Sequence, residues 1–311
     1  MDGGNALFPE QMNLRTSSTF YCPRQVIKEI LGLIYPVLKI CFPLPNVKTI
    51  DETIDKIKKD KSSIARYGDG EFLFIMDKIG YDYQKYDEIL SRRLKEILKS
   101  DNENILIGLP VGYQSLANLN RRSQLTWKSH IVWTYPRLRK FLDMKKTYYN
   151  ASFTRPFINF SNKTVSERYF RKVKELWQDR DIILVEGEKS RLGVGNDLFS
   201  NAGSLVRILG PARNAFTRYH ELLNEIVKHD KTKLVLLALG STATVLAFDL
   251  GKRGYQALDV GNIDIEYEWF LRGANSKVKI PGKYTNEAPG GREVEDIRDE
   301  LYESQIIKRI L

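Results

Sequence analysis

The sequence is poor in the side chains that bind soft metals and form disulfide bonds. Its 311 residues include two cysteines, Cys22 and Cys41, which form no C-x-x-C pair. Three histidines are present, and they have no metal-ligand spacing: His130, His220 and His229. A zinc site and a disulfide framework are therefore not expected. The low cysteine content fits a reducing compartment, and we expect the protein to be cytoplasmic.

The sequence also lacks a long, uninterrupted hydrophobic run. Residues 1–25 are polar and irregular and do not have the pattern of a signal peptide. The apolar stretch at residues 26–42 is short for a membrane span, and charges interrupt it at Lys28, Glu29 and Lys39. Pro36 should kink or end a helix there. We therefore do not expect this stretch to cross a membrane.

Two interpretations of residues 26–42 stay open. The segment is either an interfacial helix that rests on the inner face of a membrane, or a helix packed on the main domain. Pro43-Leu44-Pro45 marks a boundary after it. We therefore divide the chain into an N-terminal extension, residues 1–45, and a main domain, residues 46–311.

Two nucleotide-binding signatures are incomplete. The loop Gly240-Ser241-Thr242 lacks the lysine of G-x-x-x-x-G-K-[ST], so it is not the phosphate loop of an NTPase. Gly193 and Gly195 lack the third glycine of the dinucleotide fingerprint and do not directly follow a strand. A redox enzyme is therefore disfavoured.

Positive charge is the main compositional feature that is present. The formal net charge is +10, with 42% hydrophobic and 28% charged residues. This is a normal globular mixture with an ample core. The charge favours anionic partners such as nucleotides, phosphates, nucleic acid or acidic lipid surfaces. A generally basic soluble protein would have the same balance.

Short apolar runs alternate with helical patterns along the main domain. Clear core strands are expected at residues 105–109, 181–185 and 233–239, and helices at 86–100, 166–178 and 216–229. Apolar strands that alternate with helices indicate a parallel sheet covered on both faces. We predict an α/β fold, Rossmann-like, with a mostly parallel sheet.

The segment Arg66-Tyr67-Gly68-Asp69-Gly70-Glu71 carries the most informative chemistry. If it is extended, Asp69 and Glu71 point to one face and converge on one point. Carboxylate oxygens suit Mg²⁺ or Mn²⁺, and Arg66 could hold a phosphate. The segment therefore suggests a metal-bridged phosphate site, although a solvated acidic turn would have the same sequence.

Three further loops follow predicted strands, where α/β sheets bind their ligands. Glu186 follows one strand and leads to Arg191. Gly240-Ser241-Thr242 follows another strand and opens a helix, whose free N–H groups can hold a phosphate. Routine strand-to-helix turns contain the same residue types. Their shared edge predicts a polar cleft of nucleotide size.

The third loop follows the strand expected at residues 255–260. It leads to three alternating acids, Asp264, Glu266 and Glu268, among bulky apolar residues. If the segment is extended, all three lie on one face. If it is helical, Asp264 and Glu268 are stacked at i,i+4 and repel each other. Either arrangement could supply a general base, whereas solvated acids beside a core contact are the alternative.

The chain as a whole resembles the GT-D-type glycosyltransferases, a family formerly described as domain of unknown function 1792. The resemblance runs from about residue 46 to the C-terminus. Five motifs carry it in one order: R-Y-G-D-G-E at 66–71, V-E-G-E-K-S-R-L-G-V-G-N-D-L-F at 185–199, R-I-L-G-P-A-R-N-A-F at 207–216, L-G-S-T-A-T-V-L-A-F-D-L at 239–250 and D-V-G-N-I-D-I-E-Y-E-W-F at 259–270.

The resemblance implies transfer of a hexose, typically glucose, from a UDP-sugar to a glycan or glycoprotein acceptor, with no nucleic-acid partner. Asp69 and Glu71 would serve Mn²⁺ or Mg²⁺ and the diphosphate. Positive potential would come from Arg66, Arg191 and the helix start at Gly240. Glu266 or Glu268 would deprotonate the acceptor hydroxyl.

Two positions depart from the family pattern. Ser241 stands where we expect proline, and Asn262 stands where we expect histidine. The second change leaves the base and the sugar specificity open. Two other functions also stay open, a glycoside hydrolase with paired carboxylates and a non-catalytic nucleotide-binding module.

Overall fold

The computed structural model describes residues 23–81 and 83–311, so Cys22 and most of the polar N-terminal segment lie outside it. The described residues form a nine-stranded sheet in the order β1-β4-β3-β2-β8-β7-β5-β6-β9, and every paired neighbour is parallel. The strands are β1 (Asn46–Val47), β2 (Ser63–Arg66), β3 (Ile105–Leu109), β4 (Thr147–Asn150), β5 (Asp181–Gly187), β6 (Ser204–Gly210), β7 (Leu234–Ala238), β8 (Gln256–Asp259) and β9 (Ile306–Arg309). The predicted Rossmann-like α/β fold is confirmed.

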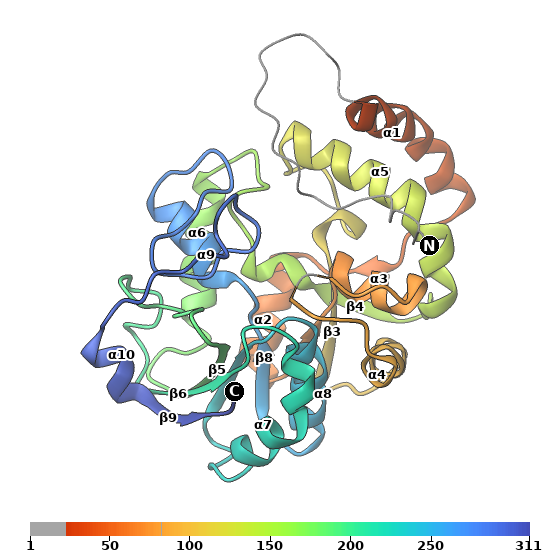
Figure 1. Ribbon diagram of the computed structural model, residues 1–311. Helices are drawn as coiled ribbons and strands as arrows, with labels where there is room; N and C mark the ends of the chain where they lie inside the picture. The colour runs from red at the N-terminus through yellow and green to blue at the C-terminus, as the bar shows by residue number, and fades with distance from the viewer. Residues whose placement is uncertain (1–22, 82) are drawn as a thin grey trace, which may run out of the picture.

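Helices cover both faces of the sheet (Figure 1). One apolar core lies between the sheet and α3 (Asp69–Asp77), α4 (Glu88–Leu98), α5 (Arg121–Leu138), α7 (Tyr219–Ile226) and α8 (Ser241–Lys252). The core on the other face includes α2 (Ile50–Asp60), α6 (Thr164–Lys174) and α9 (Ile263–Leu271). The short helix α10 (Glu300–Gln305) leads to the edge strand β9.

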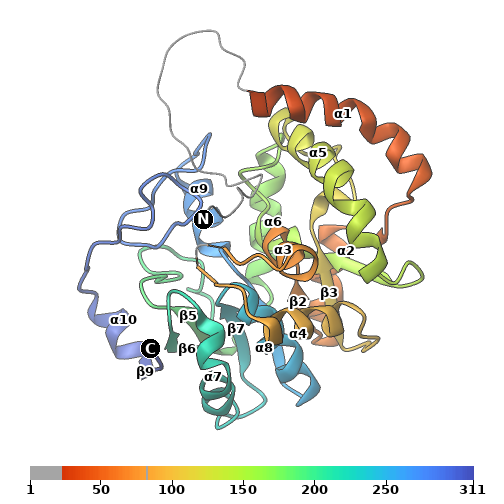
Figure 2. The same ribbon diagram turned by 45° about the vertical axis from the view of Figure 1, so that its right-hand side comes forward.

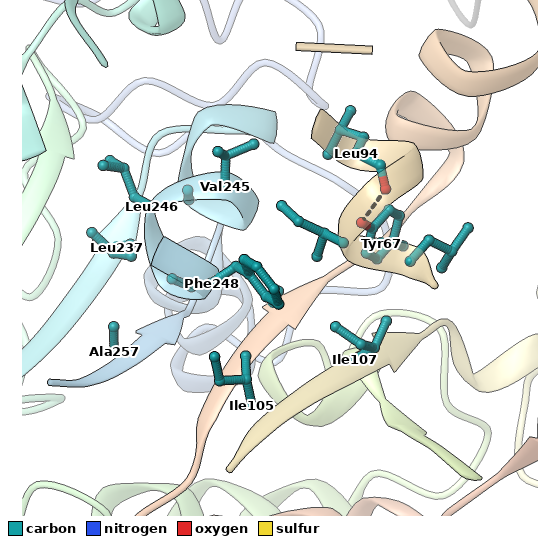
Figure 3. Close-up of a cluster of buried hydrophobic side chains, with 14 of the residues drawn as sticks. Tyr67, Leu94, Ile105, Ile107, Leu237, Val245, Leu246, Phe248 and Ala257 are labelled. Atoms are coloured by element: carbon teal, nitrogen blue, oxygen red, sulfur yellow. Dashed lines mark hydrogen bonds between the residues drawn. The ribbon is translucent and has the colours of Figure 1, made fainter. Parts of the chain in front are cut away.

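The side chains of each inner strand divide between these two cores. In β3, Ile105 and Ile107 join the core beneath α8, whereas Leu106 joins the opposite one. Figure 3 shows the first core, where Tyr67 donates a hydrogen bond to the carbonyl oxygen of Leu94 at 2.7 Å. Burial on both faces explains why these strands are short, continuous apolar runs.

The order of the strands reverses between β2 and β8. Strands β3 and β4 extend the sheet on the β2 side, and β7, β5 and β6 extend it on the β8 side. Connections leave the carboxyl ends of the two central strands in different directions, which opens a crevice where α/β sheets bind ligands. The loops before α3, α8 and α9 all start at this edge.

The structure decides the conformation of two segments for which the sequence left an extended arrangement open. The segment at Asp69 and Glu71 is not extended, because α3 begins at Asp69. Of the two conformations considered for Asp264 to Glu268, the structure has the helical one, α9. The strands β6 and β9 were not predicted at all.

The N-terminal helix α1 (Pro23–Cys41) packs along α5 at one side of the molecule (Figures 1 and 2). The two views agree that α1 lies on the outside of α5. Among the described residues, no helix is both long and apolar enough to cross a bilayer. The segment at 26–42 is therefore a helix packed on the main domain, and its contact with a membrane stays a separate question.

Candidate active site at the switch point of the sheet

The crevice between β2 and β8 is held together at its base by Arg66 and Asp259. The guanidinium Nη2 of Arg66 lies 3.1 Å from Asp259 Oδ1, and Nη1 donates to Thr154 Oγ1 at 2.6 Å and to the Ala151 carbonyl at 3.1 Å. Burial raises the pKa of Asp259, and the charge of Arg66 opposes that shift. Arg66, which we expected to hold a phosphate, thus joins the ends of two central strands.

Asp69 and Glu71 have opposite surroundings at the start of α3. Residues two apart in a helix point about 200° away from each other. Asp69 is accordingly exposed, and Glu71 is buried. The Glu71 carboxylate turns back and accepts the backbone N–H of Gly68 at 2.8 Å, which caps the helix. The two carboxylates therefore do not converge as an extended segment would make them.

The other oxygen of Glu71 binds the start of α8. Ser241 donates its hydroxyl to Glu71 Oε1, and Tyr81 donates to the same oxygen at 3.2 Å. Burial raises the pKa of Glu71, and the hydrogen bond from Ser241 opposes the shift. Ser241, the residue at the expected proline position, thus links the two helix starts through Glu71.

The start of α8 is enclosed by aromatic rings. Gly240 has a φ of +56°, and a Cβ atom there would lie 2.5 Å from the ring of Tyr83. The rings of Tyr81 and Tyr83 are 4.5 Å apart. Thr242 Oγ1 is buried and has no hydrogen-bond partner within residues 23–81 and 83–311. Tyr81 and Tyr83 therefore wall the helix start, and sequence reasoning missed both.

A charged group lies beside this wall. Arg155 is ion-paired with Glu287, and Lys277 Nζ lies 2.8 Å from Glu287 Oε2. Burial would raise the pKa of Glu287, but Arg155 and Lys277 outweigh it and hold that pKa far below the usual range. Asn262 donates to Glu287 Oε1 at 3.2 Å, so the residue at the expected histidine position belongs to this group.

The charged group and the helix starts share one electrostatic neighbourhood. Burial would lower the pKa of Arg155, but the charges of Glu287 and Glu266 outweigh it and raise that pKa, and Asp69 adds a smaller contribution. The phenol pKa of Tyr83 is raised mainly by burial, with Glu71 and Glu287 adding to the effect. Arg155 and Glu287 are 132 residues apart in sequence and neither lies in a recognisable motif, so the sequence carried no local signal for them.

The acid cluster on α9 divides into two parts. Asp264 and Glu268 lie one helical turn apart, and Lys283 Nζ sits between them at 2.7 and 3.1 Å. Asn196 Nδ2 also donates to both carboxylates, at 2.8 and 2.7 Å. Burial alone would raise the pKa of Glu268, but Lys283 and Asn196 lower it overall. These two acids tie α9 to neighbouring loops.

Glu266 lies on the other side of α9 and is fully buried. Its Oε2 accepts the backbone N–H groups of Phe157 and Ile158 at 3.3 and 3.1 Å. Its Oε1 lies 3.6 Å from Arg155 Nε and has no hydrogen-bond partner in the described part of the chain. Burial raises the pKa of Glu266. Of the three acids, Glu266 is the one that adjoins the charged group.

Glu186 and Arg191 serve loops further along the sheet. Glu186 is buried and pairs with Arg207 at 2.6 Å, and it accepts the Leu192 N–H at 2.8 Å. Arg191 donates to the carbonyls of Gly282 and Glu295 at 2.7 and 3.0 Å. Arg191 thus holds the segment around residues 282–295 in place, and Glu186 holds the loop at Leu192 against β6, so both have supporting roles. The structure does not bring them into the hydrogen-bonded group of Glu71.

The donor set at the start of α3 fits one kind of metal site. The described residues contain no cluster of three or more His, Cys, Asp or Glu side chains arranged to hold a metal. Mg²⁺ and Mn²⁺ that bind through substrate phosphates need only one or two carboxylates. Asp69 is exposed and fits that requirement, whereas both oxygens of Glu71 already accept hydrogen bonds. Glu71 therefore fits as the support of this site.

Comparison with known proteins gives a consistent result. The family model described as "Glycosyltransferase GT-D fold" matches residues 64–288. The chain is 40% identical over 268 residues to the "Probable glycosyl transferase Gly" of Streptococcus gordonii, which covers 85% of this chain and 39% of that protein. It is 39% identical over 292 residues to "Glycosyltransferase GlyD" of Streptococcus pneumoniae serotype 4, and this match covers 93% of this chain and 36% of that protein. The chain thus spans less than two fifths of the length of these curated relatives.

Solved structures share the fold. A glycosyltransferase (DUF1792) from Streptococcus sanguinis superimposes with a TM-score of 0.81 and 36% identity, covering 86% of this chain and all of that one. A second structure, described as a domain of unknown function 1792 with a distinct glycosyltransferase fold, has the same TM-score and identity and covers 92% of this chain and 99% of that one.

Proposed function

The chain belongs to the family with the glycosyltransferase GT-D fold, and on that premise we propose that it transfers a hexose from a UDP-sugar to a glycan or glycoprotein acceptor, with Mn²⁺ or Mg²⁺ as cofactor. Glucose is the expected sugar. The glycosyltransferase names of the two streptococcal relatives support the reaction class. The donor, the metal and the acceptor are proposals.

One observation carries the proposal: two helix starts meet at the switch point of the sheet. Glu71 accepts hydrogen bonds from Gly68 at the start of α3 and from Ser241 at the start of α8. This bridge joins the starts of the two helices and leaves Asp69 exposed at the first position of α3. An exposed carboxylate next to a positive helix end suits a metal-bound diphosphate.

Each residue of the group has a part in holding the leaving nucleotide. A divalent cation bound at Asp69 would act as a Lewis acid that stabilises the negative charge of the departing diphosphate. The first N–H groups of α8 and the Thr242 hydroxyl, which has no hydrogen-bond partner among the described residues, would donate to phosphate oxygens. Tyr81 and Tyr83 would exclude water from this end of the crevice, which strengthens the electrostatic interactions there.

Glu266 is the candidate that we prefer as the base for the acceptor hydroxyl. Its Oε1 accepts no hydrogen bond from the described residues and lies 3.6 Å from Arg155 Nε, and burial raises its pKa, which favours proton uptake. Asp264 and Glu268 are less suited, because Lys283 and Asn196 hold their oxygens. Since Glu266 is fully buried, an acceptor would reach it only after neighbouring residues move.

A donor screen tests the proposal. The protein is incubated with Mn²⁺ and a panel of UDP-, GDP- and CMP-sugars, and the released nucleotide is measured. We expect release of UDP, fastest with UDP-glucose, and loss of the signal when EDTA is in excess. Release from no nucleotide sugar, together with cleavage of a glycoside in the absence of nucleotide, would identify a hydrolase and overturn the proposal.

A further inference from the structure

Helix α1 has two apolar faces, and the structure uses one of them. The inner face packs along α5, where Gly32 comes so close that a Cβ atom would lie 2.9 Å from Leu125 Cδ1. Leu38 is buried in the core, and Lys28 Nζ reaches Thr126 Oγ1 at 3.4 Å. A helix on the surface of a globular protein normally has this one apolar stripe.

The outer face is apolar and uncovered within the described residues. Its members recur every three or four residues, so they line one side of the helix. Leu33 and Ile40 expose 80% and 82% of their surface, and Val37 exposes 61%. The same face continues with the exposed residues Val26, Ile27, Ile30 and Ile34. A contiguous row of this kind marks an interaction surface.

The positive charge around helix α1 indicates which kind of partner contacts its outer face. Helix α1, α5 and the single turn η2 (Arg139–Phe141) together contain nine basic residues and one acidic residue, Glu29. These 40 residues therefore hold a net charge of +8 out of the +10 of the whole chain. From neighbouring elements, Asp77 of α3 faces this layer and pairs with Arg137 at 2.6 Å. Trp133 of α5, half exposed, adds the amphipathic ring that is common at bilayer interfaces.

We propose that α1 docks the protein on an anionic lipid bilayer, with its outer apolar face in the headgroup region and the basic residues of α1 and α5 against the lipid phosphates. Apolar insertion and attraction to anionic lipid add to each other in such helices. A second copy of the chain is disfavoured as the occupant, because two layers of net charge +8 would face each other. The proposal does not depend on the transferase activity.

Vesicle flotation of the full chain tests the docking surface. Wild-type protein is mixed with phosphatidylcholine vesicles with and without phosphatidylglycerol. The test variant is Leu33→Ser/Ile40→Ser, and the matched control is Leu301→Ser/Ile307→Ser, which removes two exposed apolar residues at the opposite edge of the sheet. Circular dichroism and thermal unfolding are recorded for all three proteins.

We expect wild type and control to float with anionic vesicles and the test variant to lose about tenfold or more in partition coefficient, with unchanged Tm. Neutral vesicles and high salt should both weaken wild-type binding. Vesicle binding that does not depend on lipid charge, or that the serine substitutions leave unchanged, would overturn the proposal. If wild type forms a concentration-dependent dimer and the test variant stays monomeric, a second copy of the chain is the occupant, and the proposal is overturned. A lowered Tm of the test variant without vesicle binding would show that the chain itself covers this face, which also overturns the proposal.

Discussion

At the scale of single residues, the site contains carboxylates that the fold places in different surroundings. Asp69 is exposed and Glu71 is buried, although they are two positions apart. The D-x-E pattern could be recognised in the sequence, and with it the importance of this position. The different roles of Asp69 and Glu71 could not be recognised, because they depend on α3 starting at Asp69 and on Ser241, 170 residues away from Glu71.

Substitutions of two acids of α9, Glu266 and Glu268, should likewise have different effects. We expect Glu266→Gln to lower transfer by about 10²–10⁴-fold while UDP affinity changes little, because a base acts on the acceptor. Glu268→Gln should leave the turnover of folded protein within a few-fold and lower its stability instead, since it leaves Lys283 with a weaker partner. Turnover, UDP titration and denaturant midpoints are measured for both variants. Equal turnover of the two would contradict this assignment.

Glu287 gives a prediction on pH. Its pKa is depressed in the folded protein, so its ion pairs stabilise the fold above its unfolded pKa, about 4.3, and this contribution fades as the pH falls toward the folded value. At neutral pH, Glu287→Gln leaves Arg155 and Lys277 without their shared carboxylate, and we expect a loss of about 3 kcal/mol. The difference from wild type should be constant from pH 7 to about 5 and should shrink as the pH is lowered below about 4.3, as measured by urea unfolding.

The control for Glu287 is Glu221→Gln, which removes an exposed carboxylate paired with Arg218. This change should stay within about 0.5 kcal/mol at every pH, as surface pairs contribute little. If the Glu287→Gln difference were independent of pH, the ion pair with Arg155 would not be the cause of the stabilisation.

At the scale of elements, the inner strands and the helices between them were predictable, and the edges of the sheet were not. The strands β3, β5 and β7 are continuous apolar runs because both of their faces are buried. Strand β6 was missed because Arg207 interrupts its run, and that buried arginine is accommodated by its pair with Glu186 on β5 and by hydrogen bonds to Leu192 and Gln305. A long-range partner of this kind leaves no trace in local sequence.

The start of α3 gives a prediction at this scale. Replacing glycine by alanine inside a helix normally stabilises it by about 1 kcal/mol. At Gly70, however, the new Cβ would lie 2.6 Å from the ring of Tyr81. We therefore expect Gly70→Ala to destabilise the protein by about 1–3 kcal/mol. In a Tyr81→Ala background the same substitution should be neutral or stabilising, which a double-mutant cycle by urea unfolding measures. A stabilising Gly70→Ala in the wild-type background would mean that Tyr81 does not pack on this helix start.

At the scale of the whole molecule, topology assembles the candidate site. The sequence predicted which loops share the carboxyl edge of the sheet, because parallel strands end on the same side. It did not predict that β2 and β8 would be neighbours, and that pairing is what brings Arg66 to Asp259 and sets α3 beside α8. The folded topology also brings Arg155 and Glu287 together, although they are far apart in the sequence. The basic layer formed by α1 and α5 lies beside this crevice, since α5 also packs against α3.

The central claim is that Asp69 is the exposed carboxylate that binds the metal and diphosphate of a nucleotide sugar. The most direct measurement is UDP-sugar turnover by Asp69→Asn against Asp77→Asn, the same exchange at the other end of α3, where the carboxylate pairs with surface Arg137. The account predicts that Asp69→Asn loses about 10²-fold or more of the metal-dependent turnover, the scale for losing a transition-state charge stabiliser, while Asp77→Asn stays close to wild type. Equal turnover of wild type and a folded Asp69→Asn variant would contradict it.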